Sequence, residues 1–174
     1  MSSIHAPREP GDLRSSLERK YGPGSFDLMT ARLGALGTAE GIEFRFDRAL
    51  RVNTFDAHRL LAWAADEGLP VQNRLADLLF SAYFEDGENV ADRSTLRAAA
   101  VSAGLDGDQA ARVLDGDKYE DEVSDDLRTA VDLQVTGVPA FFVGESLFIP
   151  GAQEVKTMVA LLDRVHDRFG GGTS

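Results

Sequence analysis

Few side chains in this sequence could carry out covalent chemistry, and cysteine is absent from all 174 residues. Disulfides, thiolate metal sites and a cysteine nucleophile are therefore excluded within this chain. The histidines are His5, His58 and His166, which are isolated from one another and from acids at metal-ligand spacing, and no H-x-x-H or HExxH motif occurs. The sequence thus predicts neither a metal site nor a catalytic residue.

The acidic residues do not suggest a catalytic pair either. "EDGENVAD" (85–92) and "DGDKYEDE" (115–122) resemble calcium loops only faintly, because neither combines alternating acids, a glycine at the sixth place and a final glutamate in register. No Gly-x-Ser-x-Gly elbow and no phosphate loop is present. We interpret both stretches as solvated acidic turns.

Charge and composition limit the partners and the location. The chain has 18 basic and 29 acidic residues, a net charge of −11, so phosphate backbones and anionic lipid surfaces are repelled. We therefore expect no nucleic-acid partner and no membrane partner. The start of the chain has neither a basic head nor an apolar stretch for export, which leads us to expect a cytoplasmic protein.

The spacing of apolar residues predicts a mostly helical chain as far as residue 135. A first helix is expected from Asp12 and a second from a Ser25 N-cap, followed by "IEFRFD" (42–47) as an extended segment with one buried side. Asn53 is placed to cap a central helix that ends at Gly68. Four further helices are expected at 71–85, 94–103, 108–115 and 119–135.

The pattern of residue types changes from helical to strand-forming after residue 136. "AFFVGESLFI" (140–149) is rich in aromatic and β-branched residues, and Gly144-Glu145-Ser146 has the right length for a hairpin loop. A final helix is expected over 153–169. The preceding "GVP" (137–139) is by composition alone more simply an ordinary proline at a strand edge, although the order helix, hairpin, helix is that of the C-terminal ββα unit of a thioredoxin-like domain.

Five segments in the same order carry a family resemblance over nearly the whole chain from about Asp12. They are "NTFDAHRLLAWA" (53–64), "LLFSAYFEDGENVAD" (78–92), "AGLD" (103–106), "GVPAFFV" (137–143) and "GAQ" (151–153). With them the chain resembles the DsbA-like thioredoxin family, in the FrnE-type branch related to 2-hydroxychromene-2-carboxylate isomerase and kappa-class glutathione transferase.

The resemblance implies an α/β thioredoxin-like fold with a large all-helical insertion. Here it implies a mostly helical chain with a C-terminal β-hairpin and helix, and with the N-terminal strand-helix-strand of the fold missing. The expected organisation is a flexible lead-in (1–11), a helical insertion domain (12–136), the C-terminal half of a thioredoxin-like domain (137–169) and a flexible tail (170–174).

The resemblance also implies a substrate-binding site. Pro139 would be a cis proline facing the missing active-site helix, with the Val138 backbone pairing with a thiol-containing peptide or with glutathione. Gly151, Ala152 and Gln153 would lie at the N-terminus of the last helix, where amide groups favour a carboxylate. Asn53 and His58 match a family motif. We nevertheless expect structural roles for them before functional ones, with Asn53 as an N-cap and His58 as a packed core imidazole.

The absence of thiols limits the function that the family resemblance implies. Thiol–disulfide exchange needs an attacking thiolate and a resolving thiol, and this chain has neither. We expect a truncated DsbA-like thiol–disulfide oxidoreductase that lacks its Cys-x-x-Cys segment, requires no cofactor and is not competent alone.

Two alternatives stay open. One is a non-catalytic binding module that uses the cis-proline groove for a peptide or thiol compound, with glutathione as a ligand. The other is a relative of glutathione-dependent isomerases or transferases. If the chain is complete, a homodimer through the open sheet edge is expected, because the missing strand leaves that edge unpaired.

Overall fold

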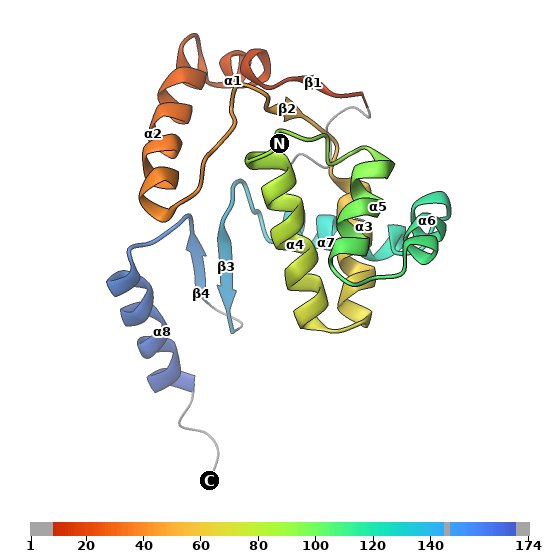
Figure 1. The fold of residues 1–174 in the computed structure, drawn as a ribbon. Helices are drawn as coiled ribbons and strands as arrows, with labels where there is room; N and C mark the ends of the chain where they lie inside the picture. Colours follow the sequence, from red (N-terminus) through yellow and green to blue (C-terminus); the bar gives the residue numbers. More distant parts are fainter. Residues whose placement is uncertain (1–8, 145–146, 170–174) are drawn as a thin grey trace. The chain divides into compact units, whose positions relative to one another are not determined.

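The computed structural model describes residues 9–144 and 147–169, which form two compact units (Figure 1). Residues 2–126 make up the first unit and residues 127–174 the second, so the division falls within helix α7. The boundary expected between 136 and 137 stays a prediction, because contact compactness does not test membership of a thioredoxin-like domain. In the part of the chain that is described, no helix is long and apolar enough to cross a bilayer.

The first unit is mostly helical. Its elements in chain order are β1 (Gly11–Asp12), α1 (Leu13–Tyr21), α2 (Ser25–Glu40), β2 (Leu50–Arg51), α3 (Phe55–Asp66), α4 (Leu69–Phe84), α5 (Arg93–Ser102), α6 (Gly107–Asp115) and the start of α7 (Glu120–Asp132). The two short strands pair antiparallel, with Gly11 opposite Arg51. The predicted helices are confirmed, with ends that shift by a few residues.

The first two helices begin with different kinds of N-cap. Asp12 caps α1, since its carboxylate accepts a hydrogen bond from the Ser15 amide at 2.7 Å. The Ser25 cap is wrong: Gly24 is the N-cap of α2, in the left-handed region at φ 77°, and Ser25 is the first helical residue. A tight turn after Pro23 needs that backbone conformation, which glycine adopts without steric cost.

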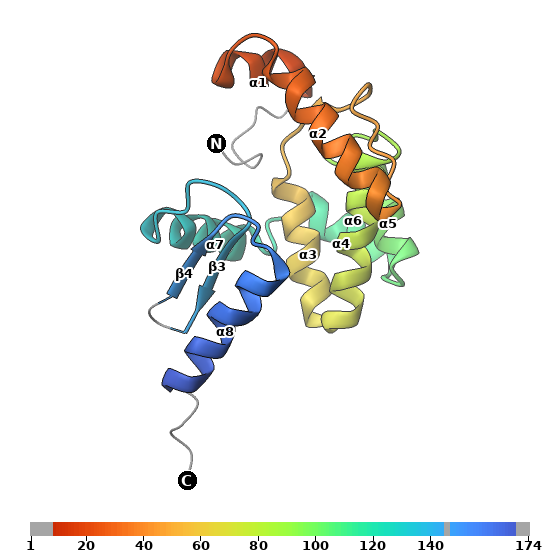
Figure 2. The same ribbon diagram turned by 90° about the vertical axis from the view of Figure 1, so that its left-hand side faces the viewer.

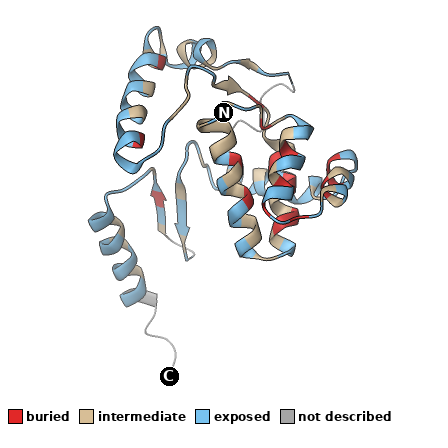
Figure 3. Ribbon diagram, viewed as in Figure 1, coloured by how far each residue is buried: buried red, intermediate tan, exposed pale blue. Residues whose placement is uncertain are grey.

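The core of the first unit lies among α3, α4, α5 and α6, where the buried residues concentrate (Figure 3). Helix α3 is buried on several sides, as predicted, because Leu60, Trp63 and Ala64 fall on more than one face and all have at most 5% of their surface exposed. The helices that contact it most are α4 and α6.

The "IEFRFD" segment is not a strand with one buried side, which corrects that prediction. Ile42 is exposed, whereas Phe44 and Phe46 are half-buried and stack on each other with ring centroids 5.1 Å apart. Phe44 also lies against Gly37 of α2 and meets Phe84 of α4 edge-on at 5.6 Å. Aromatic packing against two helices, rather than a sheet, fixes this stretch.

The second unit contains a β-hairpin and a helix after the end of α7. Strands β3 (Ala140–Val143) and β4 (Leu147–Pro150) pair antiparallel with Phe141 opposite Ile149, and helix α8 (Val155–Phe169) lies beside them (Figures 1 and 2). The predicted hairpin and last helix are confirmed, although the helix begins at Val155 rather than at Gln153.

Some expected features fall outside the described residues. These are the lead-in as far as residue 8, the loop residues Glu145 and Ser146, and the tail from residue 170. Gly11, which was expected to end the lead-in, belongs to β1.

Replacing Gly37 tests whether Phe44 anchors α2. A Cβ at Gly37 would lie 2.5 Å from the Phe44 ring and 2.8 Å from the Ile42 carbonyl oxygen, so Gly37→Ala should lower the free energy of unfolding by about 1–3 kcal/mol. Gly34→Ala in the same helix meets nothing within 4 Å and should raise it by about 0.5–1 kcal/mol. Urea denaturation measures both, and equal effects would contradict the close approach.

Candidate functional site

The loop before β3 places Val138 and Pro139 at the surface. Val138 has 89% of its surface exposed, and the Val138–Pro139 peptide bond is cis. The Pro139 carbonyl accepts a hydrogen bond from the Gly151 amide at 2.8 Å, which continues the hairpin beyond its last strand pair. Two of the expected site residues, Pro139 and Gly151, are therefore held together.

The segment 151–153 connects β4 to α8. Gly151 adopts φ 74°, in the left-handed region that favours glycine. Ala152 and Gln153 are exposed, and the Gln153 side-chain amide donates to the Pro150 carbonyl at 2.8 Å. Because α8 starts at Val155, these residues precede its first turn, and their binding of an anionic group stays a prediction.

Asn53 and His58 belong to the first unit. The Asn53 side chain accepts a hydrogen bond from the Phe55 amide at 2.9 Å, but Thr54 occupies the N-cap position of α3, so the expected cap is displaced by one residue. The prediction of a packed core imidazole is wrong, because His58 is exposed, on a side of α3 away from the core residues Leu60 and Ala64.

The surroundings of His58 still affect its ionisation. Partial removal from water lowers the pKa of His58 below its usual value, and the negative charge of Asp126 opposes that shift. Protonation of the imidazole is therefore less favourable in the folded chain than in the unfolded chain.

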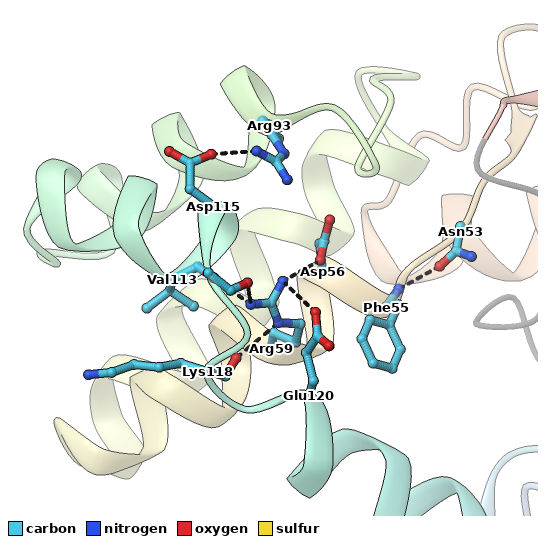
Figure 4. Close-up of polar contacts among 10 residues, drawn as sticks. Asn53, Phe55, Asp56, Arg59, Arg93, Val113, Asp115, Lys118 and Glu120 are labelled. Atoms are coloured by element: carbon cyan, nitrogen blue, oxygen red, sulfur yellow. Dashed lines mark hydrogen bonds and ion pairs between the residues drawn. The ribbon is translucent and has the colours of Figure 1, made fainter.

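The most elaborate polar arrangement surrounds Arg59, a residue that sequence reasoning missed (Figure 4). Its side chain is only 2% exposed and lies on α3. The guanidinium donates to the carbonyl oxygens of Lys118 at 2.9 Å and of Val113 and Gly116 at 2.5 Å each. Arg59 thereby binds the end of α6 and the following loop to α3.

Two carboxylates complete the shell around this cation. Asp56, one helical turn earlier, accepts from Arg59 at 2.8 Å, and Glu120 lies 3.7 Å away. An aspartate three residues before an arginine in an otherwise apolar run was the signal that could have revealed the pair, since the two share a helix face. The carbonyl partners lie more than fifty residues away in sequence and had no local signal.

A polar pocket of about 510 Å³ opens beside Arg59. Its charged and polar lining consists of Asn53, Asp56, Arg59, Arg93, Asp115 and Glu120. Arg93 is ion-paired with Asp115, and Arg59 is already surrounded by acceptors, so both cations serve internal contacts. No group of metal-ligating side chains occurs within ranges 9–144 and 147–169.

Tyr119 fixes the same loop from its other end. Its backbone is left-handed at φ 65°, and its hydroxyl donates to Asp66 at 2.7 Å. Partial burial, together with Asp66 and neighbouring acids, raises the pKa of Tyr119 to about 12. The loop from Gly116 to Tyr119 is therefore held to α3 at two points.

Comparisons with known proteins bear on this architecture. A family model described as the DSBA-like thioredoxin domain matches residues 8–163. The chain belongs to the DsbA-like thioredoxin family. The predicted fold class and family are thereby confirmed, whereas the FrnE-type branch stays a prediction.

Two individual proteins illustrate how far the similarity extends. The crystal structure of the probable DsbA oxidoreductase SCO1869 from Streptomyces coelicolor has a TM-score of 0.82 and 32% identity, covering 95% of this chain and 70% of that one. The uncharacterized protein YwbO of Bacillus subtilis (strain 168) is 33% identical over 75 residues. That match covers 42% of this chain and 37% of the length of YwbO.

Substitution of Arg59 tests its role in this DsbA-like chain. Arg59→Lys keeps the charge but loses the planar fork, leaving buried carbonyls without donors, and should cost roughly 3–5 kcal/mol of unfolding free energy. Arg93→Lys is the matched control: the Arg93 side chain is 58% exposed in its pair with Asp115, so the cost should be about 0–1 kcal/mol. Equal losses of unfolding free energy in the two variants, measured by urea denaturation, would refute the role of Arg59 in binding the end of α6 and the following loop to α3.

His58 leads to a prediction about pH. Because folding lowers the pKa of His58, the unfolded chain binds the proton more tightly, and stability is lost as the pH falls through the unfolded value of about 6.5. Between about pH 8 and pH 5, wild-type protein should therefore lose more unfolding free energy than His58→Gln. Urea denaturation across this range measures the difference. If the unfolding free energies of the two proteins change in parallel with pH, His58 does not contribute to the pH dependence of stability.

Proposed function

We propose that this chain provides the substrate-binding side of a DsbA-like thiol–disulfide oxidoreductase site. The loop at Val138 and Pro139, with Gly151 beside it, would receive an extended thiol-containing peptide or a small thiol such as glutathione. The single observation that carries the proposal is that Val138 is exposed next to a loop fixed by the Pro139–Gly151 hydrogen bond.

Backbone pairing supports the preference for an extended ligand. A peptide can add to a free strand end through main-chain hydrogen bonds, which give affinity without demanding a particular side chain. Val138 leads directly into β3, and its 89% exposure leaves room for such a ligand. Broad recognition of peptides is what a thiol–disulfide oxidoreductase of many substrates requires.

The electron transfer itself must come from elsewhere. Exchange requires a thiolate that attacks a sulfur and a second thiol that resolves the mixed disulfide. The 174 residues contain no cysteine, so the contribution of this chain is binding and orientation. The redox thiols, in this proposal, belong to a group outside these residues. The alternative function, a non-catalytic binding module, would use the same loop at Val138 and Pro139 without any group that carries redox thiols.

Titration followed by amide NMR shifts tests the site. We expect a cysteine-containing peptide and reduced glutathione to shift the amides of Val138 and of 151–153, whereas a serine analogue of the peptide separates thiol recognition from backbone recognition. Val138→Asp should weaken binding about tenfold or more, since each 1.4 kcal/mol is a factor of ten.

Val159→Asp serves as the control, because Val159 is 50% exposed on α8 and lies away from the loop in sequence. It should leave binding unchanged. The proposal fails if neither ligand shifts these amides, or if the two variants weaken binding alike.

A further inference from the structure

The polar pocket beside Arg59 is large enough for a small ligand. Its volume of about 510 Å³ lies within the range of roughly 300–1,000 Å³ that small-molecule sites occupy. Every residue that lines it lies between positions 53 and 120, and therefore within the first unit. The walls of the pocket thus belong to a single compact part of the chain.

These walls carry one more carboxylate than they carry cations. Asp56 accepts a hydrogen bond from Arg59 at 2.8 Å, and Asp115 is ion-paired with Arg93. The Glu120 carboxylate lies 3.7 Å from the Arg59 guanidinium, which is too far for a hydrogen bond. It accepts no hydrogen bond from any residue within ranges 9–144 and 147–169. Three acids and two arginines therefore leave the lining with a net charge of −1.

Arg59 is not free to neutralise Glu120 more closely. Four of the five N–H groups of its guanidinium already donate to Asp56 and to three backbone carbonyls. A shift toward Glu120 would lengthen these bonds and leave buried carbonyl oxygens without donors, which is costly. The Glu120 side chain, by contrast, is 49% exposed and can turn toward a cation that enters the pocket.

Apolar side chains form the rest of the lining. They are Phe55, Ala91 and Leu114. Phe55 is the first residue of α3, and Glu120 reaches from the start of α7 toward Arg59 in the same helix (Figure 4). The face of an aromatic ring attracts a cation, and an alkyl chain gains free energy when it leaves water. No group of metal-ligating side chains occurs in the described part of the chain, so these walls suit an organic cation better than a metal ion.

The charge of the surrounding unit also favours a cationic ligand. Residues 2–126 contain 14 basic and 24 acidic residues, a net charge of −10. Seven of these acids lie within 115–126, the segment that supplies Asp115, Gly116 and Glu120 to the lining. A negative field of this kind raises the local concentration of cations and lowers that of anions.

We propose that this pocket binds a small primary ammonium ion carried on a short apolar chain, with Glu120 as its ion-pair partner and Phe55 as its aromatic wall. Asp56 and Asp115 offset the charges of Arg59 and Arg93, so that Glu120 remains for the ligand. The inference stands without the proposed function, because it uses neither a thiol nor the loop at Val138.

The first test compares three probes with the same chain length. Pentylammonium, pentanol and pentanoate are titrated at constant ionic strength and about pH 7, where the amine and the acid are both ionised. The amide NMR shifts of Ala91, Gly116 and Glu120 report occupancy. Pentylammonium should bind at least about threefold more tightly than pentanol, and pentanoate should not bind. The proposal is overturned if pentanol or pentanoate binds as tightly as pentylammonium, or if pentylammonium shifts none of these amides.

The second test uses variants with matched charge. Glu120→Gln and Asp121→Asn each remove one negative charge from the start of α7, but only Glu120 lines the pocket. Glu120→Gln should weaken pentylammonium binding about threefold to fivefold, whereas Asp121→Asn should leave it nearly unchanged. Equal effects would mean that the general negative field, and not this pocket, attracts the amine.

Phe55→Leu provides a further variant that leaves the charges in place. It keeps an apolar wall but removes the aromatic face, so pentylammonium binding should weaken about twofold to fivefold while pentanol binding changes less. Urea denaturation confirms that each variant is folded before titration. Unchanged pentylammonium binding in Phe55→Leu and Glu120→Gln would reject the assigned site.

Discussion

A buried cation must be surrounded by acceptors, and that requirement organises the first unit of this chain. Arg59 is 2% exposed, and its guanidinium is met by three carbonyl oxygens and by Asp56. Leaving a buried charge unpaired is far more costly than any single apolar contact is favourable. The end of α6 and the loop before α7 therefore cannot move away from α3 without exposing or stranding that charge. The polar pocket beside Arg59 shares part of this arrangement, because Asp56, Gly116 and Glu120 in its lining also contact the guanidinium.

The second unit represents the opposite situation, in which polar backbone groups are left without partners. Its hairpin carries apolar side chains on both faces, since Phe142 and Phe148 stack on one side while Ile149 on the other is buried. A two-stranded hairpin that is apolar on both sides is typical of the interior of a larger sheet. Pro150 removes one outward donor from the edge of β4, because proline has no backbone N–H.

Membership of the DsbA-like family connects this geometry with sulfur chemistry, while the composition separates the two. A thiolate is the nucleophile in disulfide exchange, and no arrangement of the side chains present can replace it. What the chain does offer is a fixed loop at Pro139 and Gly151 beside an exposed Val138. In the proposed function, this chain supplies the binding part of a redox site, and the reactive part is not among these residues.

Local patterns in the sequence were sufficient to predict the helices, the hairpin and the family, because 3.6-residue periodicity, capping side chains and turn residues act over a few positions. The absence of thiol chemistry within this chain also follows from the sequence alone, because the amino-acid composition does not depend on the fold. Ser25, the "IEFRFD" segment and His58 were misjudged because their environments depend on Gly24, Phe84 and the orientation of α3. Only tertiary structure could decide the role of Arg59, whose carbonyl partners lie far along the chain. The same holds for the backbone groups of the hairpin that point outward, because these depend on strand register rather than on residue type.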